Sequence, residues 1–258
     1  MVSGPAPASP PPRAVVFDTD GVLLDSARVH AAAWKAAFDP CLSARARDGD
    51  RQPPFDSEGE YRRFVDGRSR YDGAAALLTA RGLDLPAGTP DDPPGCDTVW
   101  AIAARKERAF RDLVGAQGVP VFPDAAPALD ALRAARVPCA AVSASRHARE
   151  LLKASGLAGL LPVIVDGAAA AALGLAGKPD PALFLHAAAL LGSRPADAAV
   201  VEDALAGVRA ARRGRFGLVV GLDRTPDGRM TGPLREQGAD LTVADLTLLV
   251  RGVWGERA

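Results

Sequence analysis

Short apolar runs that end at polar residues recur along the chain, and they predict the buried strands of a parallel sheet. The clearest run is AVVF at residues 14–17, which a cluster of carboxylates and a glycine follows at once. Five later segments have the same character, the second and fifth of them more weakly: residues 137–143, 161–167, 198–203, 216–223 and 239–243.

Helical spacing fills the gaps between these runs, because apolar residues there recur every three or four positions. The predicted helices are residues 127–136, 148–155, 181–191 and 205–213. Asp180 and Pro181 supply an N-cap and a first-turn proline for the third of them. Strands and helices that alternate in this way predict an α/β fold, a Rossmann-like doubly wound parallel sheet.

The residues between about 27 and 117 break this alternation, since no buried strand is convincing there. Helical patterns are separated by loops rich in proline and glycine, and we expect the loops at residues 43–54 and 86–97 to be mobile. The helical patterns cover residues 27–38, 57–65, 73–81 and 98–114. A stretch of this kind inside an α/β sheet predicts an inserted α-helical cap domain.

The predicted domain division follows from this break. Residues 27–117 form the cap, and residues 13–26 and 118–258 form the α/β core. Residues 1–12 are rich in proline and have no apolar core of the signal-peptide type, so they predict a disordered tail.

The charge balance and the cysteines bear on the expected partners and on the compartment of the protein. Lys plus Arg and Asp plus Glu both number 31, which gives no reason to expect a nucleic acid or a membrane as partner. The longest apolar stretches, such as residues 168–175, are too short to span a bilayer. Cys41, Cys96 and Cys139 are scattered, which favours a reducing compartment over a disulfide framework. We therefore expect a cytoplasmic monomer.

Polar residues end three of the predicted strands, and ligands of open α/β sheets bind beyond such strand ends. Asp18 and Asp20 follow the first strand, and Ser143 ends the second. Glu202 and Asp203 end the strand at residues 198–203. One such acid alone would be explained as well by capping of the following helix, but three strand ends with complementary residues favour one shared site.

Asp18 and Asp20 lie two positions apart, so their side chains point the same way on an extended chain. Their mutual repulsion requires a cation, for which Asp203 and Glu202 can supply further oxygen ligands. An oxygen shell completed by phosphate and water suits Mg²⁺. We expect the metal to keep Asp18 ionised for attack, while Asp20, turned away from the metal, keeps a higher pKa and carries a proton.

Two further residues complete a candidate phosphate site. The Ser143 hydroxyl and the backbone N–H groups after it, beginning with Ala144, can donate to phosphate oxygens. Lys178, in the loop GKPDP, offers a compact positive charge, although a lysine found there alone would be interpreted as solvated. Phosphoryl transfer mainly requires positioning and charge neutralisation, which this set of residues provides.

Four segments together resemble the motifs of the haloacid dehalogenase superfamily, over residues 13–245. In chain order the motifs are FDTDGVLLDS at residues 17–26, AVSAS at 141–145, GKPDP at 177–181 and VVEDALAGV at 200–208. The resemblance implies an aspartyl-phosphate on Asp18 and acid/base work by Asp20. It also implies Mg²⁺ held by Asp18, the Asp20 main-chain oxygen and Asp203, with Ser143 and Lys178 on the transferring phosphate.

The predicted cap carries candidate substrate-binding residues. His30, Trp34 and Phe38 share one face of a helix at four-residue spacing. They could pack the interior of the cap, but a histidine and a tryptophan so near the first motif favour contact with substrate. Arg68 and Arg70 lie in the turn FVDGRSRYDG, and the planar guanidinium suits a phosphate dianion, although loop arginines are more often solvated.

These cap features together are similar to the beta-phosphoglucomutase subgroup, which interconverts β-glucose 1-phosphate and glucose 6-phosphate through a bisphosphate. The resemblance implies that His30 assists Asp20 in proton handling and that Arg70 holds the non-transferring phosphate. It also implies that Gly67 lets the backbone approach the sugar. Val22 fits this sugar-phosphate branch of the superfamily.

The chain also departs from that subgroup. His147 stands where asparagine is common, Ala104 stands where some mutases have a lysine, and the two cap loops are long. We expect Ser145 and His147 to contact substrate. The expected activity is Mg²⁺-dependent phosphoryl transfer on a small sugar phosphate, as in a beta-phosphoglucomutase, and hydrolysis of a sugar phosphate or a related metabolite is the alternative. The intact set of motif residues argues against a binding module without activity, and dehalogenation would not need Asp20.

Overall fold

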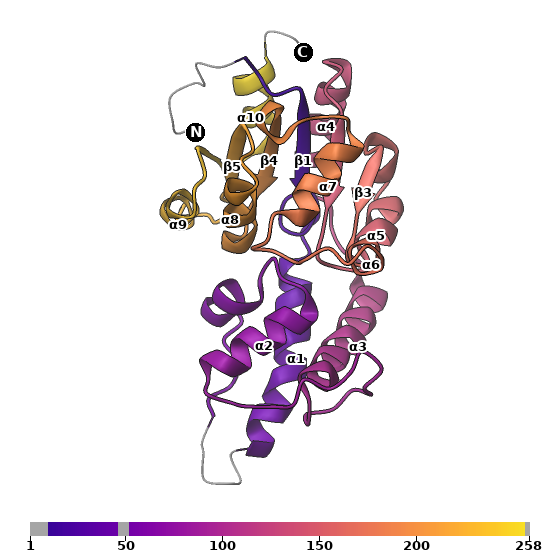
Figure 1. Cartoon of the computed structure of the whole chain (residues 1–258), viewed down its shortest axis with the longest axis vertical. Coiled ribbons are helices and arrows are strands. Elements are labelled where there is room, and N and C mark those ends of the chain that lie inside the picture. Colours follow the sequence, from indigo (N-terminus) through magenta and orange to yellow (C-terminus); the bar gives the residue numbers. More distant parts are fainter. Residues whose placement is uncertain (1–9, 46–51, 256–258) are drawn as a thin grey trace. The chain divides into compact units, whose positions relative to one another are not determined.

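The computed structural model describes residues 10–45 and 52–255, which form two compact units (Figure 1). The core unit comprises residues 1–25 and 120–258, and the cap unit comprises residues 26–119. The sequence places the same divisions after residues 26 and 117, so each predicted boundary lies within two residues of the boundary in the structure. Residues 1–9, most of the predicted tail, lie outside the described part of the chain, as does part of the predicted loop at residues 43–54.

The core unit is built on a six-stranded parallel sheet with the order β3-β2-β1-β4-β5-β6. The strands are β1 (Ala14–Asp18), β2 (Cys139–Val142), β3 (Val163–Val165), β4 (Ala198–Glu202), β5 (Leu218–Leu222) and β6 (Leu241–Val243). Each strand coincides with one of the predicted apolar runs, and the predicted doubly wound sheet is confirmed. The strand order reverses beside β1, which is where such sheets bind ligands.

Helices cover both faces of this sheet (Figure 1). They are α4 (Ala125–Ala134), α5 (Ala148–Ala154), α6 (Gly167–Ala172), α7 (Ala182–Leu190), α8 (Leu205–Arg213), α9 (Thr231–Glu236) and α10 (Leu246–Trp254), with 3-10 turns η3 (Leu157–Leu160) and η4 (Pro195–Asp197). The spacing argument predicts α4, α5, α7 and α8 but misses the other three. α6 has no buried residue to give it an apolar stripe, and the side chain of Asp166 caps its first N–H groups instead.

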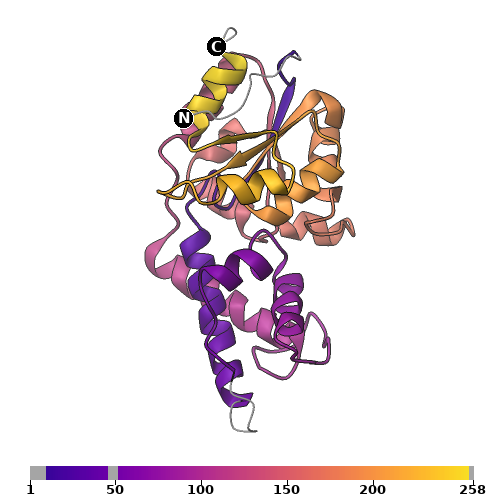
Figure 2. The same cartoon turned by 90° about the vertical axis from the view of Figure 1, so that its left-hand side faces the viewer.

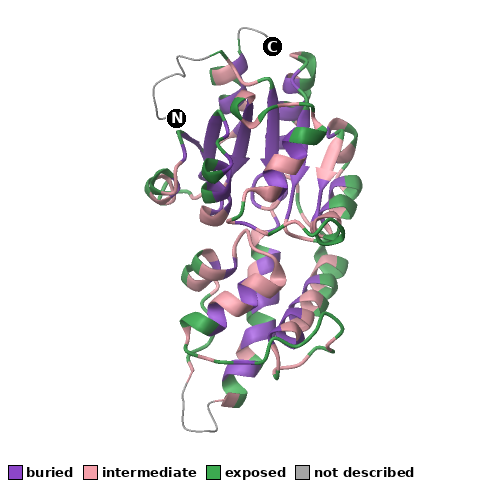
Figure 3. Cartoon of the chain, viewed as in Figure 1, coloured by how far each residue is buried: buried purple, intermediate pink, exposed green. Residues whose placement is uncertain are grey.

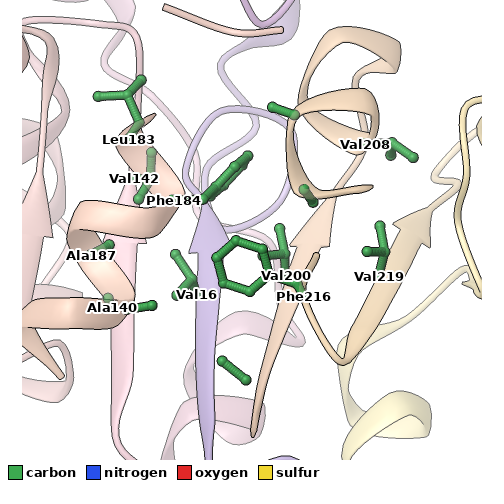
Figure 4. Packing of buried hydrophobic residues seen from close by; sticks show 14 of the residues in the cluster. Val16, Ala140, Val142, Leu183, Phe184, Ala187, Val200, Val208, Phe216 and Val219 are labelled. Carbon is green, nitrogen blue, oxygen red and sulfur yellow. The ribbon is translucent and has the colours of Figure 1, made fainter. Parts of the chain in front are cut away.

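Buried aliphatic side chains fix the central strands in place. Strands β1, β2, β4 and β5 are buried along their whole length, whereas the edge strand β3 is only partly buried (Figure 3). Figure 4 shows Val16 of β1 between Ala140 of β2 and Val200 of β4, and Phe184 of α7 belongs to the same buried cluster. Because each strand is anchored by such contacts, the residues at the strand ends are held at defined positions.

The cap unit consists of helices, with no strand among its described residues. It contains α1 (Ala27–Arg45), the π-helical turn η2 (Tyr61–Val65), α2 (Arg70–Ala80) and α3 (Val99–Gln117). Helices α1 and α3 run side by side, as Figure 1 and Figure 2 both show. Trp34 stacks on Phe38 at 5.0 Å between ring centroids, and Phe38 lies 5.2 Å from Phe55. The aromatic stripe of α1 therefore forms part of the interior of the cap.

Helix α1 continues beyond its predicted end at residue 38, although Pro40 lies inside it. A proline normally disfavours helical geometry in the residue before it. Here Cys41 and Leu42 are buried beyond the proline, and Lys35 pairs with Asp39 at 2.8 Å one turn earlier. Burial of the final turn in the interior of the cap outweighs the local cost of the proline.

Cys41 and Cys96 form a disulfide with a Cα–Cα distance of 5.1 Å, so the prediction of three unpaired cysteines is wrong. Fifty-five residues separate the two in sequence, and only the folded cap brings them together. Cys139 is a free, buried thiol, and its burial raises the pKa of the thiol to about 12. The disulfide therefore lies in the cap unit, while the free thiol lies in the core unit.

The loop at residues 86–97, predicted to be mobile, is fastened at several points. The disulfide holds Cys96, and the Val99 N–H donates to the Pro86 carbonyl at 3.0 Å. Asp92 accepts hydrogen bonds from the hydroxyls of Thr98 at 2.5 Å and Thr89 at 2.9 Å. These contacts join the loop to the first turn of α3 and to Cys41 of α1.

Among the described residues, no helix combines the length and the apolar character that crossing a bilayer requires.

Candidate active site

Lys178 lies at the centre of a buried ionic cluster in the core unit. Its Nζ donates to Asp18 Oδ1, and it donates to Glu202 Oε1 at 2.6 Å. Asp18 ends β1 and Glu202 ends the neighbouring β4, while Lys178 comes from the loop before α7. The sheet register thus brings two acids together, and the loop places one cation between them.

Burial changes the protonation equilibria of this cluster. Burial raises the pKa of Asp18 well above its usual range; the nearby Lys178 opposes this rise, and the negative charges of Glu202 and Asp20 add to it. Burial alone would lower the pKa of Lys178, but the Asp18 and Glu202 carboxylates outweigh it and raise that pKa. The lysine is therefore charged at neutral pH, and a site with more acids than bases favours a further cation.

Glu202 has a different environment from the one expected for a metal ligand. Its Oε1 accepts from Lys178, and its Oε2 accepts from the Ala204 N–H at 2.6 Å. The side chain is fully buried, and a Cβ on Gly207 would lie only 1.6 Å from Oε1. Glu202 therefore holds Lys178 in the structure, and a part for it in binding a metal stays a prediction.

Asp20 and Ser143 meet at the end of β2. The Ser143 hydroxyl donates to Asp20 Oδ2 at 2.5 Å, and the Thr19 hydroxyl donates to the Val142 carbonyl at 3.1 Å. Parallel pairing of Asp18 with Val142 brings the two strand ends level with each other. The predicted meeting of the first and second motifs is therefore visible as direct hydrogen bonds.

The loop after Ser143 has a compact backbone. The Ser145 N–H donates to the Ser143 Oγ at 2.9 Å, and the His147 N–H donates to the Ser145 Oγ at 3.3 Å. A Cβ on Gly167 would lie 2.4 Å from the Ala144 carbonyl oxygen, so this loop packs tightly against the start of α6. His147 lies at the N-terminus of α5, with Nδ1 3.8 Å from Glu150.

Asp203 packs directly against the backbone of the first motif. Gly21 has a φ of +84°, and a Cβ there would lie 1.9 Å from Asp203 Oδ2. Only glycine permits both this conformation and this close approach. The contact places the carboxylate of Asp203 beside the segment that carries Asp18 and Asp20.

These acids can be tested as a magnesium site by their donor chemistry. Asp18 and Asp203 offer carboxylate oxygens, and the backbone of Asp20 offers a carbonyl oxygen next to the tight Gly21 contact. Such hard oxygen donors fit Mg²⁺, which keeps several of its own waters. Within the described ranges, no three or more His, Cys, Asp or Glu side chains gather as a metal cluster.

In the cap unit, His30 of α1 is paired with a lysine that the sequence analysis missed. Lys106 Nζ lies 2.8 Å from His30 Nδ1, and it also lies 4.5 Å from the Phe110 ring centroid. The His30 ring stacks on Phe110 at 4.3 Å. Both His30 and Lys106 are buried. Lys106 lies two residues after Ala104 on α3, and its place on an otherwise apolar, buried helix face was the available signal in the sequence.

Arg70 is the first residue of α2 and forms an ion pair with Glu107 of α3 at 2.6 Å. Gly67, with a φ of +69°, makes the turn before α2, and Ser69 caps that helix by accepting from the Asp72 N–H. Trp34 is buried in the interior of the cap, where its ring packs on Phe38. The burial of Trp34 fits the packing interpretation, and its contact with substrate stays a prediction.

Comparisons with known proteins agree with this geometry. A family model described as haloacid dehalogenase-like hydrolase matches residues 12–215. The chain is 43% identical over 239 residues to the beta-phosphoglucomutase of Mycobacterium tuberculosis, covering 92% of this chain and 91% of the relative. It is 30% identical over 241 residues to the beta-phosphoglucomutase of Bacillus subtilis, covering 92% of each.

Solved structures share the fold. A haloacid dehalogenase family hydrolase from Deinococcus radiodurans with bound phosphate and sodium is 28% identical, with a TM-score of 0.65, and the match covers 96% of this chain and 97% of that one. A protein described as a putative beta-phosphoglucomutase from Bacteroides vulgatus is 22% identical, with a TM-score of 0.72, and the match covers 97% and 92%. The second likeness bears on the fold alone.

Proposed function

Because the chain belongs to the haloacid dehalogenase-like hydrolase family, we propose that it interconverts β-glucose 1-phosphate and glucose 6-phosphate as a beta-phosphoglucomutase. It is an enzyme of the phosphomutase or phosphatase type. The observation that carries the proposal is the buried cluster of Asp18, Lys178 and Glu202 next to the pair of Asp20 and Ser143. Similarity to two beta-phosphoglucomutases over more than nine-tenths of the chain supports the choice of substrate.

Asp18 is the proposed nucleophile. The hydrogen bond from Lys178 restrains the carboxylate through Oδ1, so the second oxygen is presented for attack on phosphorus. The P–O bond to the sugar breaks as the bond to Asp18 forms, which leaves an aspartyl-phosphate. The positive charge of Lys178 then lies beside the oxygens of the transferred group, where negative charge develops.

Asp20 is the proposed general acid and base. It protonates the departing sugar oxygen, and it later takes the proton from the sugar hydroxyl that attacks the aspartyl-phosphate. The Ser143 hydroxyl already donates to this carboxylate at 2.5 Å, so it holds Asp20 in one orientation before substrate binds. When a phosphoryl group occupies the site, we propose that Ser143 and the N–H of Ala144 donate to its oxygens instead.

A magnesium ion held by Asp18, Asp203 and the main-chain oxygen of Asp20 would neutralise charge on the nucleophile and on the phosphoryl oxygens. The donor set described above fits this ion. We leave Glu202 out of the proposed set, because both of its oxygens already accept hydrogen bonds from protein groups.

The cap residues have proposed roles in binding the sugar phosphate. The pair of His30 and Lys106 supplies a proton-carrying ring and a cation in one buried place, and we propose that it assists Asp20 in proton handling. Arg70 is proposed to bind the non-transferring phosphate, since a guanidinium binds a dianion through two parallel hydrogen bonds. Ser145 and His147 are proposed to contact the same ligand from the loop after β2.

One observation favours a second candidate, a sugar-phosphate phosphatase. Arg70 is already paired with Glu107 at 2.6 Å, so a second phosphate would have to compete with a carboxylate for the guanidinium. An enzyme that only hydrolyses a monophosphate does not need that second contact. The two activities differ in whether water or a sugar hydroxyl accepts the phosphoryl group from Asp18.

Phosphorus NMR of the protein with β-glucose 1-phosphate, Mg²⁺ and a catalytic amount of glucose 1,6-bisphosphate separates the two candidates. A mutase produces glucose 6-phosphate faster than inorganic phosphate, and the bisphosphate stimulates it. Dominant release of inorganic phosphate without stimulation by bisphosphate would show that the protein is a phosphatase.

A further inference from the structure

Arg224, just beyond the end of β5, contacts the loop that follows the catalytic acids. Its Nε donates to the Gly21 carbonyl at 3.1 Å, and one terminal nitrogen donates to the Val22 carbonyl at 2.8 Å. The side chain is largely buried, with 18% of its surface exposed. Two consecutive carbonyl groups immediately after Asp20 are therefore held by a single side chain from the opposite end of the sequence.

Asp124, next to the start of α4, holds the same guanidinium from the other side. The two terminal nitrogens of Arg224 donate to the two carboxylate oxygens of Asp124 at 3.1 and 3.0 Å. Asp124 also accepts from the Leu246 N–H at 2.7 Å, at the start of α10. The guanidinium lies 3.7 Å from the centroid of the Phe122 ring. A bidentate ion pair on a stacked guanidinium is a geometry that lysine cannot reproduce.

The loop itself is a closed turn joined to the segment where the chain returns from the cap. The Leu24 N–H donates to the Thr19 carbonyl at 2.9 Å, and the Gly21 N–H donates to the Leu24 carbonyl at 2.8 Å. The N–H of Phe122 donates to the Leu23 carbonyl at 3.1 Å. Arg224 thus contacts both partners of the Leu23–Phe122 hydrogen-bonded junction: the carbonyls of Gly21 and Val22 in the turn, and the ring of Phe122 in the returning segment.

We infer that Arg224 is a positioning residue for proton transfer: by clamping the carbonyls of Gly21 and Val22 against Asp124, it holds Asp20 at the distance that general acid catalysis requires. This inference rests on the proposed role of Asp20. In the described part of the chain, the hydrogen bonds of Arg224 and Asp124 reach neither Asp18 nor Lys178, which belong to strand β1 and to the loop before α7. Loss of the clamp should therefore impair proton transfer much more than attack by Asp18.

Two phosphate esters whose leaving groups differ in their need for a proton can separate an effect on Asp20 from an effect on Asp18. A sugar oxygen is a poor leaving group and needs a proton from Asp20, whereas p-nitrophenolate departs without one. Arg224→Lys should lower the first-turnover rate with β-glucose 1-phosphate by about 10- to 100-fold. The first-turnover release of p-nitrophenol from p-nitrophenyl phosphate should change by no more than about threefold, since it depends on Asp18.

The matched control is Arg209→Lys, because Arg209 is an exposed arginine of α8 whose guanidinium hydrogen-bonds to the side chain of Gln237. It should leave both first-turnover rates unchanged. Asp124→Asn keeps the shape of the carboxylate and removes its charge, and it should shift the two rates in the same unequal way as Arg224→Lys. Equal losses with both esters, or no loss with either, would overturn the inference.

Hydrogen exchange tests whether Arg224 holds the loop without depending on any enzyme activity. In Arg224→Lys, peptides covering residues 19–25 and 120–124 should exchange faster than in the wild type, and in Arg209→Lys they should not. If the wild type transfers phosphate from neither ester, the proposed function fails while this measurement still decides whether Arg224 holds the loop. Unchanged exchange in these peptides would show that it does not.

Discussion

The core unit and the cap unit hold their polar residues in different ways. In the core, Asp18 and Glu202 end adjacent strands, and the register of the sheet decides the distance between them. In the cap, Arg70, Glu107 and Lys106 lie on the faces of two helices, and side-chain packing decides their separation. The sheet restrains position through its backbone hydrogen bonds, whereas helices can shift or rotate relative to one another at lower cost.

Because of this difference, we expect the core residues to serve the chemical step and the cap residues to serve substrate selection. The core cluster is fully buried and is linked by charge-assisted hydrogen bonds, so changes to it should affect every phosphoryl-transfer reaction of the enzyme. The Arg70–Glu107 pair is partly exposed, with 21% and 19% of the two side chains accessible. Changes there should affect the choice of substrate more than the chemical step.

The largest expected effect comes from removing the nucleophile. Asp18→Asn should lower turnover of β-glucose 1-phosphate and of p-nitrophenyl phosphate alike, each by more than about 10³-fold. The fold should persist, because Lys178 keeps its hydrogen bond to Glu202 at 2.6 Å. Steady-state assays of both esters, with circular dichroism as the check on folding, measure this. Activity close to that of the wild type would refute the assignment of Asp18.

The next effect concerns the stability of the core alone. Lys178→Met leaves Asp18 and Glu202 buried together without their cation, which should destabilise the core by about 3–5 kcal/mol. Hydrogen exchange in urea would follow peptides of β1 and β4 for the core and of α1 for the cap. The core peptides should lose protection at lower urea while the α1 peptides stay unchanged.

Lys153→Met is the control for that comparison, because Lys153 is an exposed lysine of α5. It should leave both sets of peptides as in the wild type. Equal destabilisation by the two substitutions would contradict the structural role given to the buried ionic cluster.

The cap should respond to loss of its disulfide. Replacing Cys41 and Cys96 by serine should destabilise the cap by about 2–4 kcal/mol and leave the core peptides unchanged. Thiol titration checks the bond itself. The native wild type should react slowly, because burial raises the pKa of Cys139 to about 12, and the unfolded, unreduced chain should expose one thiol. Three thiols without a reductant would show that the bond does not form.

The smallest expected effect separates substrate choice from chemistry. Arg70→Ala should reduce mutase turnover by about 10- to 100-fold, from the loss of a charge-assisted contact to the second phosphate. First-turnover release of p-nitrophenol should not change. Arg68→Ala, in the same turn, is the matched control and should leave both rates unaltered. Equal losses of mutase and ester activity in Arg70→Ala would count against the second-phosphate role.

The sequence by itself determined the architecture of the core unit and most of its site. The strands are short, mainly apolar runs, and most of them end at or next to a polar residue, a pattern typical of buried parallel strands. Since the carboxyl ends of parallel strands share one edge, the neighbourhood of Asp18, Asp20, Ser143 and Lys178 followed from the order of the motifs.

Only the tertiary structure decided how the remaining polar groups pair. The disulfide of Cys41, the lysine beside His30 and the carboxylate on Arg70 all join residues from segments without a shared strand register. Local patterns predict which face of a helix is apolar, but they do not predict its rotation against a distant helix. The clamp at Arg224 depends in the same way on contacts 202 and 203 residues apart, which no local signal encodes.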